Sequence, residues 1–584
     1  MKNIAVGTAT SKASLDANFR NIQDNFTELF NRITDDLDAL RGTPEATGAM
    51  YLKGRTTDGD GGQGVFAWDS SDLSASVTAD TLSGIYVAPS SDLTGASGAW
   101  VRKNICPAKP EWWATNTPPG ATNMTAAIQA AIDSPSKKVV MSGVYLSNEL
   151  QITHDNTDIT GETGAIWTLK YVPTGDETSD NNIAIKLYTP NLPPSYGPRF
   201  CSIRNVLFDG SLSDKRKVAI KTEDTSVLNL ENISVRFWYG NSSIGLYLCG
   251  RDLTSISMAY ITAERPILFG RNLHGEGYGY DTDMYHLHDI AIGATTSSGI
   301  SSGHPCIEVD NDVVLFSLTL DGYQSWNLGS HGLFWDHTNR DDEQSNQIKI
   351  DNVRWEQGDT GGWMFYIKTA GDPINNVIIN NCWPVKVEQD VNGIYLERIT
   401  YATLRNCNLR VGEGRTPLFL STVSHLLTEQ IYANTGSPLS FGTMTARFAV
   451  PHTQPQDQTG YSIGIFDTLT ESNINTDNYV LVNGSKIFNI AKSIPDNASY
   501  SILTPSDNGS AVINIHGSTF MGSFYATKNA VTKLTGTVNT YAAQDGTFSH
   551  GPGWYVYILD GDINVRNYNT GAASTCNIST TFIE

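Results

Sequence analysis

Three carboxylates fall in two short apolar segments in the middle of the chain. Glu308 and Asp310 lie in CIEVD, and Asp336 lies in GLFWD. Neighbouring carboxylates raise one another's pKa, so one of them can stay protonated and act as a general acid beside an ionised partner. Glycosidases use two acids, about 5 to 5.5 Å apart for retention and about 6.5 to 9.5 Å apart for inversion. The three residues are therefore candidate catalytic acids for cleaving a glycosidic bond.

A second candidate pair, Asp321 and Glu356, lies on another set of predicted strands, flanked by Arg354 and Trp383. We expect these two carboxylates to share one outward column on adjacent coils. Both groups have a plainer interpretation, because outward carboxylates are ordinary on the solvated face of a sheet. The site can also lie in loops or at a subunit interface.

Aromatic side chains accompany the first group of acids. Phe334, Tyr366, Tyr395 and Phe419 occupy equivalent positions in successive apolar segments, and His337 follows Asp336. Aromatic rings supply large apolar faces, against which a sugar ring can stack. We therefore predict that Phe334, Tyr366, Tyr395 and His337, together with Arg354 and Trp383, bind substrate.

A repeat explains how these residues come together, because two strand families alternate from residue 205 to residue 442. The first family follows a polar residue, usually Asn, and its successive anchors are 23 to 35 residues apart. The anchors are Asn205, Asn232, Ser255, Asp289, Ser317, Asn352, Asn381, Asn406 and Gln430. The second family contains AIKTE, GLYLC, PILFG, CIEVD, GLFWD, MFYIK, GIYLE, PLFLS and PLSFG. Strands repeating at this period indicate the coils of a solenoid.

One coil can be seen in residues 346–368, NQIKIDNVRWEQGDTGGWMFYIK. Period-2 alternation places Val353, Trp355, Phe365 and Ile367 inside, and leaves Arg354, Glu356, Tyr366 and Lys368 outside. Asn at the turn can adopt the left-handed conformation and hydrogen-bond to the turn of the next coil. Outward residues of successive coils are about 4.8 Å apart, which suits paired carboxylates.

Other segments frame the repeat. An a/d seam runs through Leu15, Phe19, Ile22, Phe26, Leu29 and Ile33, and we interpret it as an oligomerisation coil, with a helix packed on its own domain as the alternative. Residues 44–105 predict a small β domain with Gly- and Asp-rich turns, including DGDGG, which lacks the later acidic ligand of a calcium loop. TNMTAAIQAAIDS predicts a short helix, and residues 436–584 predict further strands.

The composition excludes several function classes. The formal charge of −21 argues against a nucleic-acid or anionic membrane partner, and no apolar run is long enough to span a bilayer. The seven Cys have neither zinc-site nor disulfide-framework spacing.

The loop GEGYGYDTDMYHLHD is rich in His and acids but lacks a fixed ligand spacing, so we expect a groove wall and no metal or other cofactor. GISSG (299–303) matches a nucleophile elbow, but it lies in a Ser/Thr-rich loop rather than a strand-to-helix turn.

The order of these parts resembles that of bacteriophage tailspikes. The resemblance implies an all-β fold: a right-handed, pectate-lyase-like parallel β-helix with an N-terminal coiled-coil helix, a small N-terminal β domain and a C-terminal β-sandwich. The boundaries are 1–43 for the virion-proximal segment and coil, 44–106 for the small β domain, 107–435 for the β-helix and 436–584 for the C-terminal domain. The resemblance also implies a homotrimer in the virion tail, attached to the baseplate or another tail protein through its N-terminus.

What such a protein would act on is also implied by the resemblance: a capsule or O-antigen polysaccharide of the bacterial surface. Endo-glycosidic hydrolysis is the leading hypothesis. A polysaccharide lyase, which would need a base such as His337, Arg340 or Lys368, and a fibre that binds without cleaving are the alternatives.

Overall fold

The computed structural model describes residues 12–433 with gaps, and beyond them only strands β31 to β41. The gaps are 31, 46–47, 176–181, 191–196, 216, 224, 241, 250–251, 271–280, 299–301, 312, 329, 338–346, 359–361, 371, 385–390, 410 and 412–414. Two compact units make up the chain, Met1–Ser330 and His331–Glu584. In the described part of the chain, no helix is both long and apolar enough to cross a membrane.

The N-terminal helix α1 (Lys12–Phe30) covers most of the predicted seam. It ends before Ile33, which lies in strand β1, so the expectation that Ile33 continues the helical seam is wrong. Phe19 is 62% exposed in the single chain, as expected for a seam residue without a partner helix. Oligomerisation through this helix stays a prediction.

The small β domain begins earlier than residue 44. Its sheet has the strand order β1-β2-β3-β5-β4, and helix α2 contributes Leu37 and Leu40 to the same core as Phe66 and Trp100. The elements are β1 (Ile33–Thr34), α2 (Leu37–Arg41), β2 (Ala49–Leu52), β3 (Gly64–Asp69), α3 (Ser74–Ala79), β4 (Tyr86–Val87) and β5 (Ala99–Arg102). In DGDGG, Asp60 accepts hydrogen bonds from the backbone N–H groups of Arg55, Thr56, Thr57 and Gly62. This segment is therefore a carboxylate-capped turn, as the sequence predicts.

The small domain is joined tightly to the start of the β-helix. The buried Arg102 guanidinium lies 4.5 Å from the centroid of Phe66 and 4.4 Å from that of Trp112, which belongs to the 3-10 helix η2 (Pro110–Trp112). Trp113 donates a hydrogen bond to Asp80. Because Trp112 and Trp113 lie beyond the predicted boundary at residue 106, side chains from both sides of that boundary share one core.

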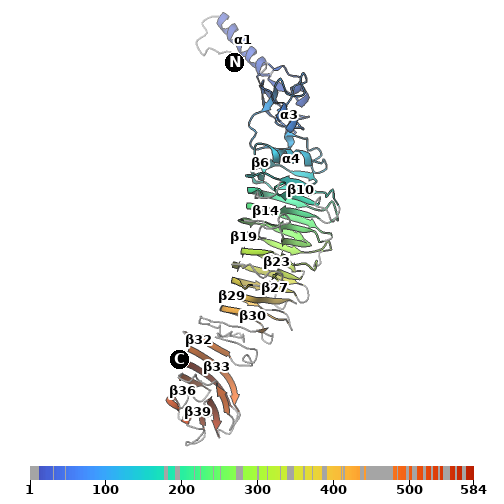
Figure 1. Ribbon diagram of the computed structural model, residues 1–584. Coiled ribbons are helices and arrows are strands. Elements are labelled where there is room, and N and C mark those ends of the chain that lie inside the picture. Colours follow the sequence, from blue (N-terminus) through green and yellow to red (C-terminus); the bar gives the residue numbers. More distant parts are fainter. Residues whose placement is uncertain are drawn as a thin grey trace. The chain divides into compact units, whose positions relative to one another are not determined.

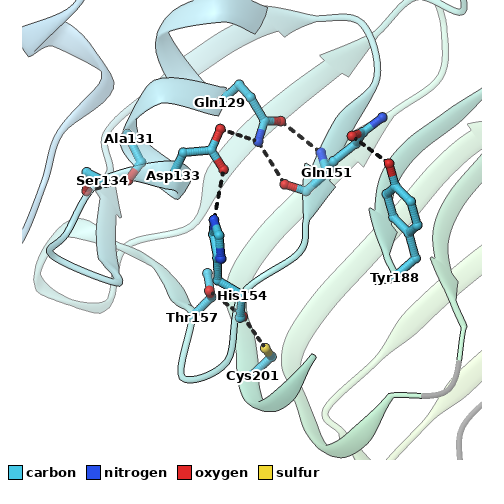
Figure 2. Close-up of polar contacts among 9 residues, drawn as sticks. All are labelled: Gln129, Ala131, Asp133, Ser134, Gln151, His154, Thr157, Tyr188 and Cys201. Carbon is cyan, nitrogen blue, oxygen red and sulfur yellow. Dashed lines mark hydrogen bonds and ion pairs between the residues drawn. The ribbon is translucent and has the colours of Figure 1, made fainter. Parts of the chain in front are cut away.

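Helix α4 (Thr125–Asp133) covers the first strands of the β-helix and buries Ala127, Ile128, Ala131 and Ile132. The Gln129 amide accepts from the backbone N–H of Gln151 and donates to its carbonyl oxygen, both at 2.9 Å (Figure 2). Gln151 lies in β8, which pairs with β11, so the amide takes the place of a strand neighbour. Covering an open edge in this way protects it from pairing with another chain.

In the first unit the β-helix consists of parallel strands in three stacks (Figure 1). One stack is β6-β9-β12-β14-β16-β19-β22, the second is β7-β10-β12-β14-β17-β20-β23, and the third is β8-β11-β13-β15-β18-β21. The early elements are β6 (Lys138–Met141), β7 (Val144–Ser147), β8 (Leu150–Ile152), β9 (Asp158–Gly161), η3 (Glu162–Gly164), β10 (Trp167–Tyr171), β11 (Ile183–Leu187), β12 (Arg199–Asp209), β13 (Val218–Thr222) and β14 (Ser226–Trp238). They are followed by β15 (Ile244–Leu248), β16 (Thr254–Ser257), β17 (Tyr260–Ala263), β18 (Arg265–Phe269), β19 (Asp281–His288), β20 (Ala291–Ala294), β21 (Ile307–Val309), β22 (Val314–Asp321) and β23 (Gln324–Leu328).

The second unit continues the same pattern of coils within itself. One stack is β24-β27-β29-β30-β31, and β25 and β26 both pair with β28, which pairs with β29. The strands are β24 (His331–His337), β25 (Gln347–Asp351), β26 (Val353–Gly358), β27 (Trp363–Thr369), β28 (Ile374–Pro384), β29 (Asn392–Leu409), β30 (Leu418–Ala433) and β31 (Ser440–Phe441). Val353, Trp355, Phe365 and Ile367 are fully buried, as predicted. The parallel β-helix is therefore confirmed.

The predicted turn ladder is present at most of the Asn anchors. Asn205, Asn232, Asn352, Asn381 and Asn406 all have φ between +47° and +58°. Side-chain amides bond from coil to coil at 2.8 Å, from Asn232 to Asn205 and from Asn406 to Asn381. Each amide thereby satisfies a neighbour's side-chain oxygen at a position where an ordinary residue would be strained.

Two anchors are wrong by a few residues. Ser255 and Ser317 lie inside β16 and β22, whereas the left-handed turn positions of these coils are Met258 (φ +52°) and Gly322 (φ +66°). A Cβ at Gly322 would lie 2.7 Å from the Asp289 carboxylate, and the positive φ of this turn favours glycine. A search for polar anchors misses both positions because neither residue is polar.

The C-terminal strands form two separate sheets. One has the order β32-β33-β41-β35-β36-β37 and the other β34-β40-β39-β38. Their bounds are β32 (Asn478–Val482), β33 (Ser485–Ile494), β34 (Ser499–Ile502), β35 (Ser510–His516), β36 (Met521–Thr527), β37 (Ala530–Gly536), β38 (Thr540–Ala543), β39 (Gly553–Leu559), β40 (Asp562–Tyr568) and β41 (Ser574–Ile583). The predicted β-sandwich stays a prediction.

Candidate functional site

A column of alternating charges lies on the outer face of the second unit. Asp336, Lys368 and Glu397 are register partners on the successive strands β24, β27 and β29. Asp336 and Glu397 are thus separated by two coil repeats, about 9.6 Å between Cα atoms. These three residues end the segments GLFWD, MFYIK and GIYLE of the second strand family, and the structure confirms that these segments align from coil to coil.

Asp336 and Glu397 have different surroundings. Burial raises the pKa of Asp336, Lys368 opposes this shift, and the Glu397 carboxylate adds to it. Its Oδ1 atom is buried and has no hydrogen-bond partner among the described residues. Glu397 instead accepts a hydrogen bond from the Tyr395 hydroxyl. The column therefore holds one carboxyl with a raised pKa and one that is hydrogen-bonded to a tyrosine.

The predicted aromatic strip is a continuous stack of rings. Ring centroids are 5.2 Å apart for Phe334 and Tyr366, and 4.4 Å apart both for Tyr366 and Tyr395 and for Tyr395 and Phe419. The planes are within 8° to 21° of parallel. Each inner ring therefore has both faces covered by its neighbours. Stacking of a sugar on the faces of the inner rings, Tyr366 and Tyr395, is therefore not available.

His331 lies beside this stack, next to both Phe334 and Tyr366. Its ring lies 4.8 Å from Phe334 and 5.4 Å from Tyr366, and its Nδ1 accepts from the backbone N–H of Trp363 at 3.1 Å. Burial lowers the pKa of His331 to about 4, so the imidazole is neutral at pH 7 with its proton on Nε2. Our sequence reasoning missed His331, since it precedes the apolar segment by which the strand was recognised.

The other acids of the first group lie in the first unit. Glu308 forms an ion pair with Arg265, with Nη2–Oε2 at 2.9 Å. Asp310 is exposed and accepts from the backbone N–H of Asn311. The predicted register is confirmed in this unit, where Leu268 pairs with Glu308. The proximity of Glu308 and Asp310 to Asp336 in the second unit stays a prediction.

Not every position of the predicted outward column faces water. Lys221 and Glu223 are only 6% and 2% exposed and form an ion pair at 2.9 Å, with Lys186 3.2 Å from the same carboxylate. Leu268 is 4% exposed and belongs to a second hydrophobic cluster with Ile244. The predicted alternation of inward and outward side chains is correct, but these outward side chains are buried from solvent.

The structure describes only part of the second candidate pair, Asp321 and Glu356. Asp321 is exposed at the end of β22 in the first unit, and Glu356 lies in β26 of the second, with its side chain outside the described part. Arg354 and Trp383 are register partners on adjacent coils, and both are exposed. Trp383 is 40% exposed, and no described aromatic ring stacks on it.

The remaining candidates are His337, Arg340 and the His- and acid-rich segment. His337 is 3% exposed, which argues against direct contact with a sugar. Arg340 lies outside the described residues, as do residues 275–280 of the His- and acid-rich segment. Asp281–His288 of the same segment form strand β19 rather than a loop, and His286 and His288 are exposed on it. Among the residues that the structure describes, no group of His, Cys, Asp and Glu could hold a metal ion.

Comparisons with known proteins give similarities at the level of solved structures. No family model matches the sequence, and no curated protein matches it. The tailspike of Acinetobacter baumannii bacteriophage Fri1, a capsular polysaccharide depolymerase, is 12% identical, with a TM-score of 0.40 over 94% of this chain and 98% of that one. The tailspike of Acinetobacter phage vb_AbaP_AS12 is 10% identical, with a TM-score of 0.44 over 89% of this chain and 96% of that one.

A glycan biofilm modifying enzyme of Pantoea stewartii is 13% identical, with a TM-score of 0.36 over 94% of this chain and 70% of that one. Many of the similar solved structures are phage tailspikes. At these identities and TM-scores the similarities assign no residue and no activity to this chain.

Proposed function

We propose that this chain is a phage tailspike that depolymerises a bacterial surface polysaccharide, a capsule or an O-antigen, by endo-glycosidic hydrolysis. The observation that carries the proposal is the outward column of Asp336, Lys368 and Glu397 on successive coils. Acid–base cleavage of a glycosidic bond requires two carboxyls, one of which stays protonated to act as the acid, and the raised pKa of Asp336 suits it to that part.

In this proposal Asp336 is the general acid. Its raised pKa keeps it protonated to higher pH than an ordinary carboxyl, and it gives its proton to the leaving glycosidic oxygen. Glu397 is the general base, which takes a proton from the water that attacks the anomeric carbon from the opposite face. A Cα separation of about 9.6 Å, two coils apart, suits the wider carboxyl spacing of inverting enzymes, about 6.5 to 9.5 Å, better than the 5 to 5.5 Å of retaining ones. We therefore propose inversion of configuration.

Glu308 and Asp310 remain proposed partners of Asp336. The Arg265 ion pair makes Glu308 the less suitable of the two, because its carboxylate oxygen already contacts the Arg265 guanidinium. Asp321 and Glu356 remain the proposed alternative site, beside Arg354 and Trp383. In either arrangement Trp383, on which no described ring stacks, is the proposed ring contact for the sugar.

The lyase alternative needs a base that removes a proton next to a uronate carboxylate. Burial and the bond to Glu397 raise the pKa of Tyr395, which makes it a poor base at neutral pH. His337 is buried, and the one basic nitrogen of His331 is occupied by the Trp363 backbone N–H, so Lys368 is the base that remains among the described candidates. Hydrolysis is favoured because the column contains two acids of unlike environment.

The test is digestion of purified polysaccharides from a panel of capsule-typed bacteria. Hydrolysis predicts new reducing ends without ultraviolet absorbance, whereas β-elimination adds the absorbance of a carbon–carbon double bond. Asp336→Asn and Glu397→Gln should each lower kcat by several orders of magnitude. Asp351→Asn, which alters a carboxylate of the other strand family, serves as the matched control. Binding without cleavage of any polysaccharide would leave only a receptor-binding fibre.

The proposed assembly is a homotrimer in the virion tail that acts outside the host cell. The N-terminal segment would attach to the baseplate or another tail protein. Support comes from helix α1, whose apolar seam includes the exposed Phe19, and light scattering of the full chain measures the assembly directly.

A further inference from the structure

A serine and a histidine that are distant in sequence meet on the surface of the first unit. Ser242 Oγ lies 3.0 Å from His304 Nε2, and both side chains are partly exposed. An activated nucleophile and its general base are recognised by a contact of this length. Neither the acid column nor the aromatic stack includes these two residues.

Ser242 sits on a turn with an unusual backbone. Its φ is +61°, and Gly240 just before it has φ +103°. A Cβ at Gly240 would lie 2.0 Å from the Asp214 carbonyl oxygen, so glycine is required there. The surrounding structure must hold a non-glycine residue in the left-handed region, so the position of the Ser242 side chain is fixed by this turn.

Glu264 is hydrogen-bonded both to the turn that carries Ser242 and to the loop that carries His304. Its carboxylate accepts from the backbone N–H groups of Gly240 at 2.8 Å and Ser242 at 2.6 Å. Its carbonyl oxygen accepts from the Ser302 hydroxyl at 2.6 Å, and Ser302 Oγ accepts from the backbone N–H of His304 at 3.3 Å. One residue therefore fixes the turn that carries the serine and the loop that carries the histidine.

The histidine has the protonation state that a base needs. Burial lowers the pKa of His304, and the positive charge of Arg265 lowers it further, so the ring is neutral at pH 7. With its proton on Nδ1, the neutral ring accepts the Ser242 hydroxyl proton at Nε2.

We propose that Ser242 and His304 form a nucleophile and general-base pair that hydrolyses carboxylic esters. An acetyl ester on a sugar hydroxyl is the ester that a polysaccharide would present, and only this choice of ester rests on the proposed depolymerase function. Ser242 is the catalytic nucleophile, His304 the base, and Glu264 a positioning residue.

The reaction balances with water as the only co-reactant. Ser242 Oγ attacks the acyl carbon while its proton moves to His304, and the ester C–O bond breaks as His304 returns that proton to the leaving alcohol. Water then gives a proton to His304 and attacks the acyl-serine. The bond from the acyl carbon to Ser242 breaks, and the serine recovers its proton.

The experiment uses the full chain with two probes, p-nitrophenyl acetate and a fluorophosphonate that modifies activated serines. The expected result is hydrolysis of the ester and covalent modification of Ser242, located by peptide mass spectrometry. Ser242→Ala should remove the modification and lower ester hydrolysis by at least about 100-fold, as should His304→Gln. Ser242→Ala keeps a Cβ at the same positive φ, so it tests the hydroxyl without changing the backbone requirement.

Ser211→Ala, at an exposed serine, is the matched control and should leave both readouts unchanged. The rate should fall as the pH drops below 6.5 and His304 becomes protonated, a profile that a non-specific surface reaction would not show. No modification of wild-type Ser242, or equal hydrolysis by Ser242→Ala and wild type, would overturn the proposal. Polysaccharide cleavage, measured separately as reducing ends, distinguishes this failure from failure of the depolymerase proposal.

Discussion

The rings of Tyr395 and Phe419 lie face to face on adjacent coils, with centroids 4.4 Å apart and planes 8° from parallel. Tyr366 covers the other face of Tyr395 at the same distance. A ring enclosed on both faces stabilises its own neighbours, and its hydroxyl is the part that faces Glu397.

The first prediction is that Tyr395→Ala destabilises the protein. Two stacked contacts, each contributing about 0.5 to 1.5 kcal/mol, are lost, so the free energy of unfolding should fall by about 1 to 3 kcal/mol. Thermal or denaturant unfolding measures the loss. Tyr395→Phe is the matched control, because it keeps the stack and removes only the hydroxyl bonded to Glu397. An Ala variant as stable as wild type but with a raised KM would show that the ring face contacts substrate after all.

The second prediction concerns the ring of Trp383. Because no described ring covers its face, Trp383→Ala should raise KM for the polysaccharide, whereas Tyr366→Phe, which keeps the stack, should change KM little. A stacking contact is made equally in the ground and transition states, so kcat should change less than KM. Unchanged KM in Trp383→Ala would move the binding surface away from this face.

The third prediction follows from the raised pKa of Asp336. The folded chain holds the proton of Asp336 more tightly than the unfolded chain, so this residue contributes stability at low pH. That contribution is lost as the pH rises from 3.8 through the raised pKa. Asp336→Asn should therefore match wild type in stability near pH 3 and equal or exceed it at pH 7, while losing turnover at both. Lower stability of the variant at pH 7 would mean that ionised Asp336 makes a stabilising contact.

The fourth prediction tests the capping of β8 by helix α4. Gln129→Ala removes two hydrogen bonds to the Gln151 backbone and exposes its N–H and carbonyl groups (Figure 2). Stability should fall by about 1 to 3 kcal/mol, and concentration-dependent association should increase. Gln151→Ala, which keeps both backbone bonds and loses only the contact with Tyr188, should have a smaller effect. Equal effects in the two variants would show that the edge is not protected by Gln129.

The sequence alone determined the coils and the columns. Strand alternation and the turn positions are local properties, so the inward Val353 and Trp355 and the register of Phe334, Tyr366 and Tyr395 followed from spacing. The same reasoning failed at Ser255 and Ser317, where Met258 and Gly322 adopt the left-handed turn conformation without a polar side chain.

The tertiary structure decided what each outward residue does. Spacing puts Asp336 and Glu397 in one column, but only the surroundings separate a carboxyl with a raised pKa from one that accepts a tyrosine hydroxyl. Spacing also places Phe334, Tyr366 and Tyr395 on successive coils, but it does not tell whether the face of each ring is free. Ser242 and His304 are 62 residues apart and belong to loops, which carry no period from which a contact can be predicted. Contacts between loops depend on where the whole fold brings the chain back, and burial depends on every group packed around a site, so neither can be derived from a local pattern.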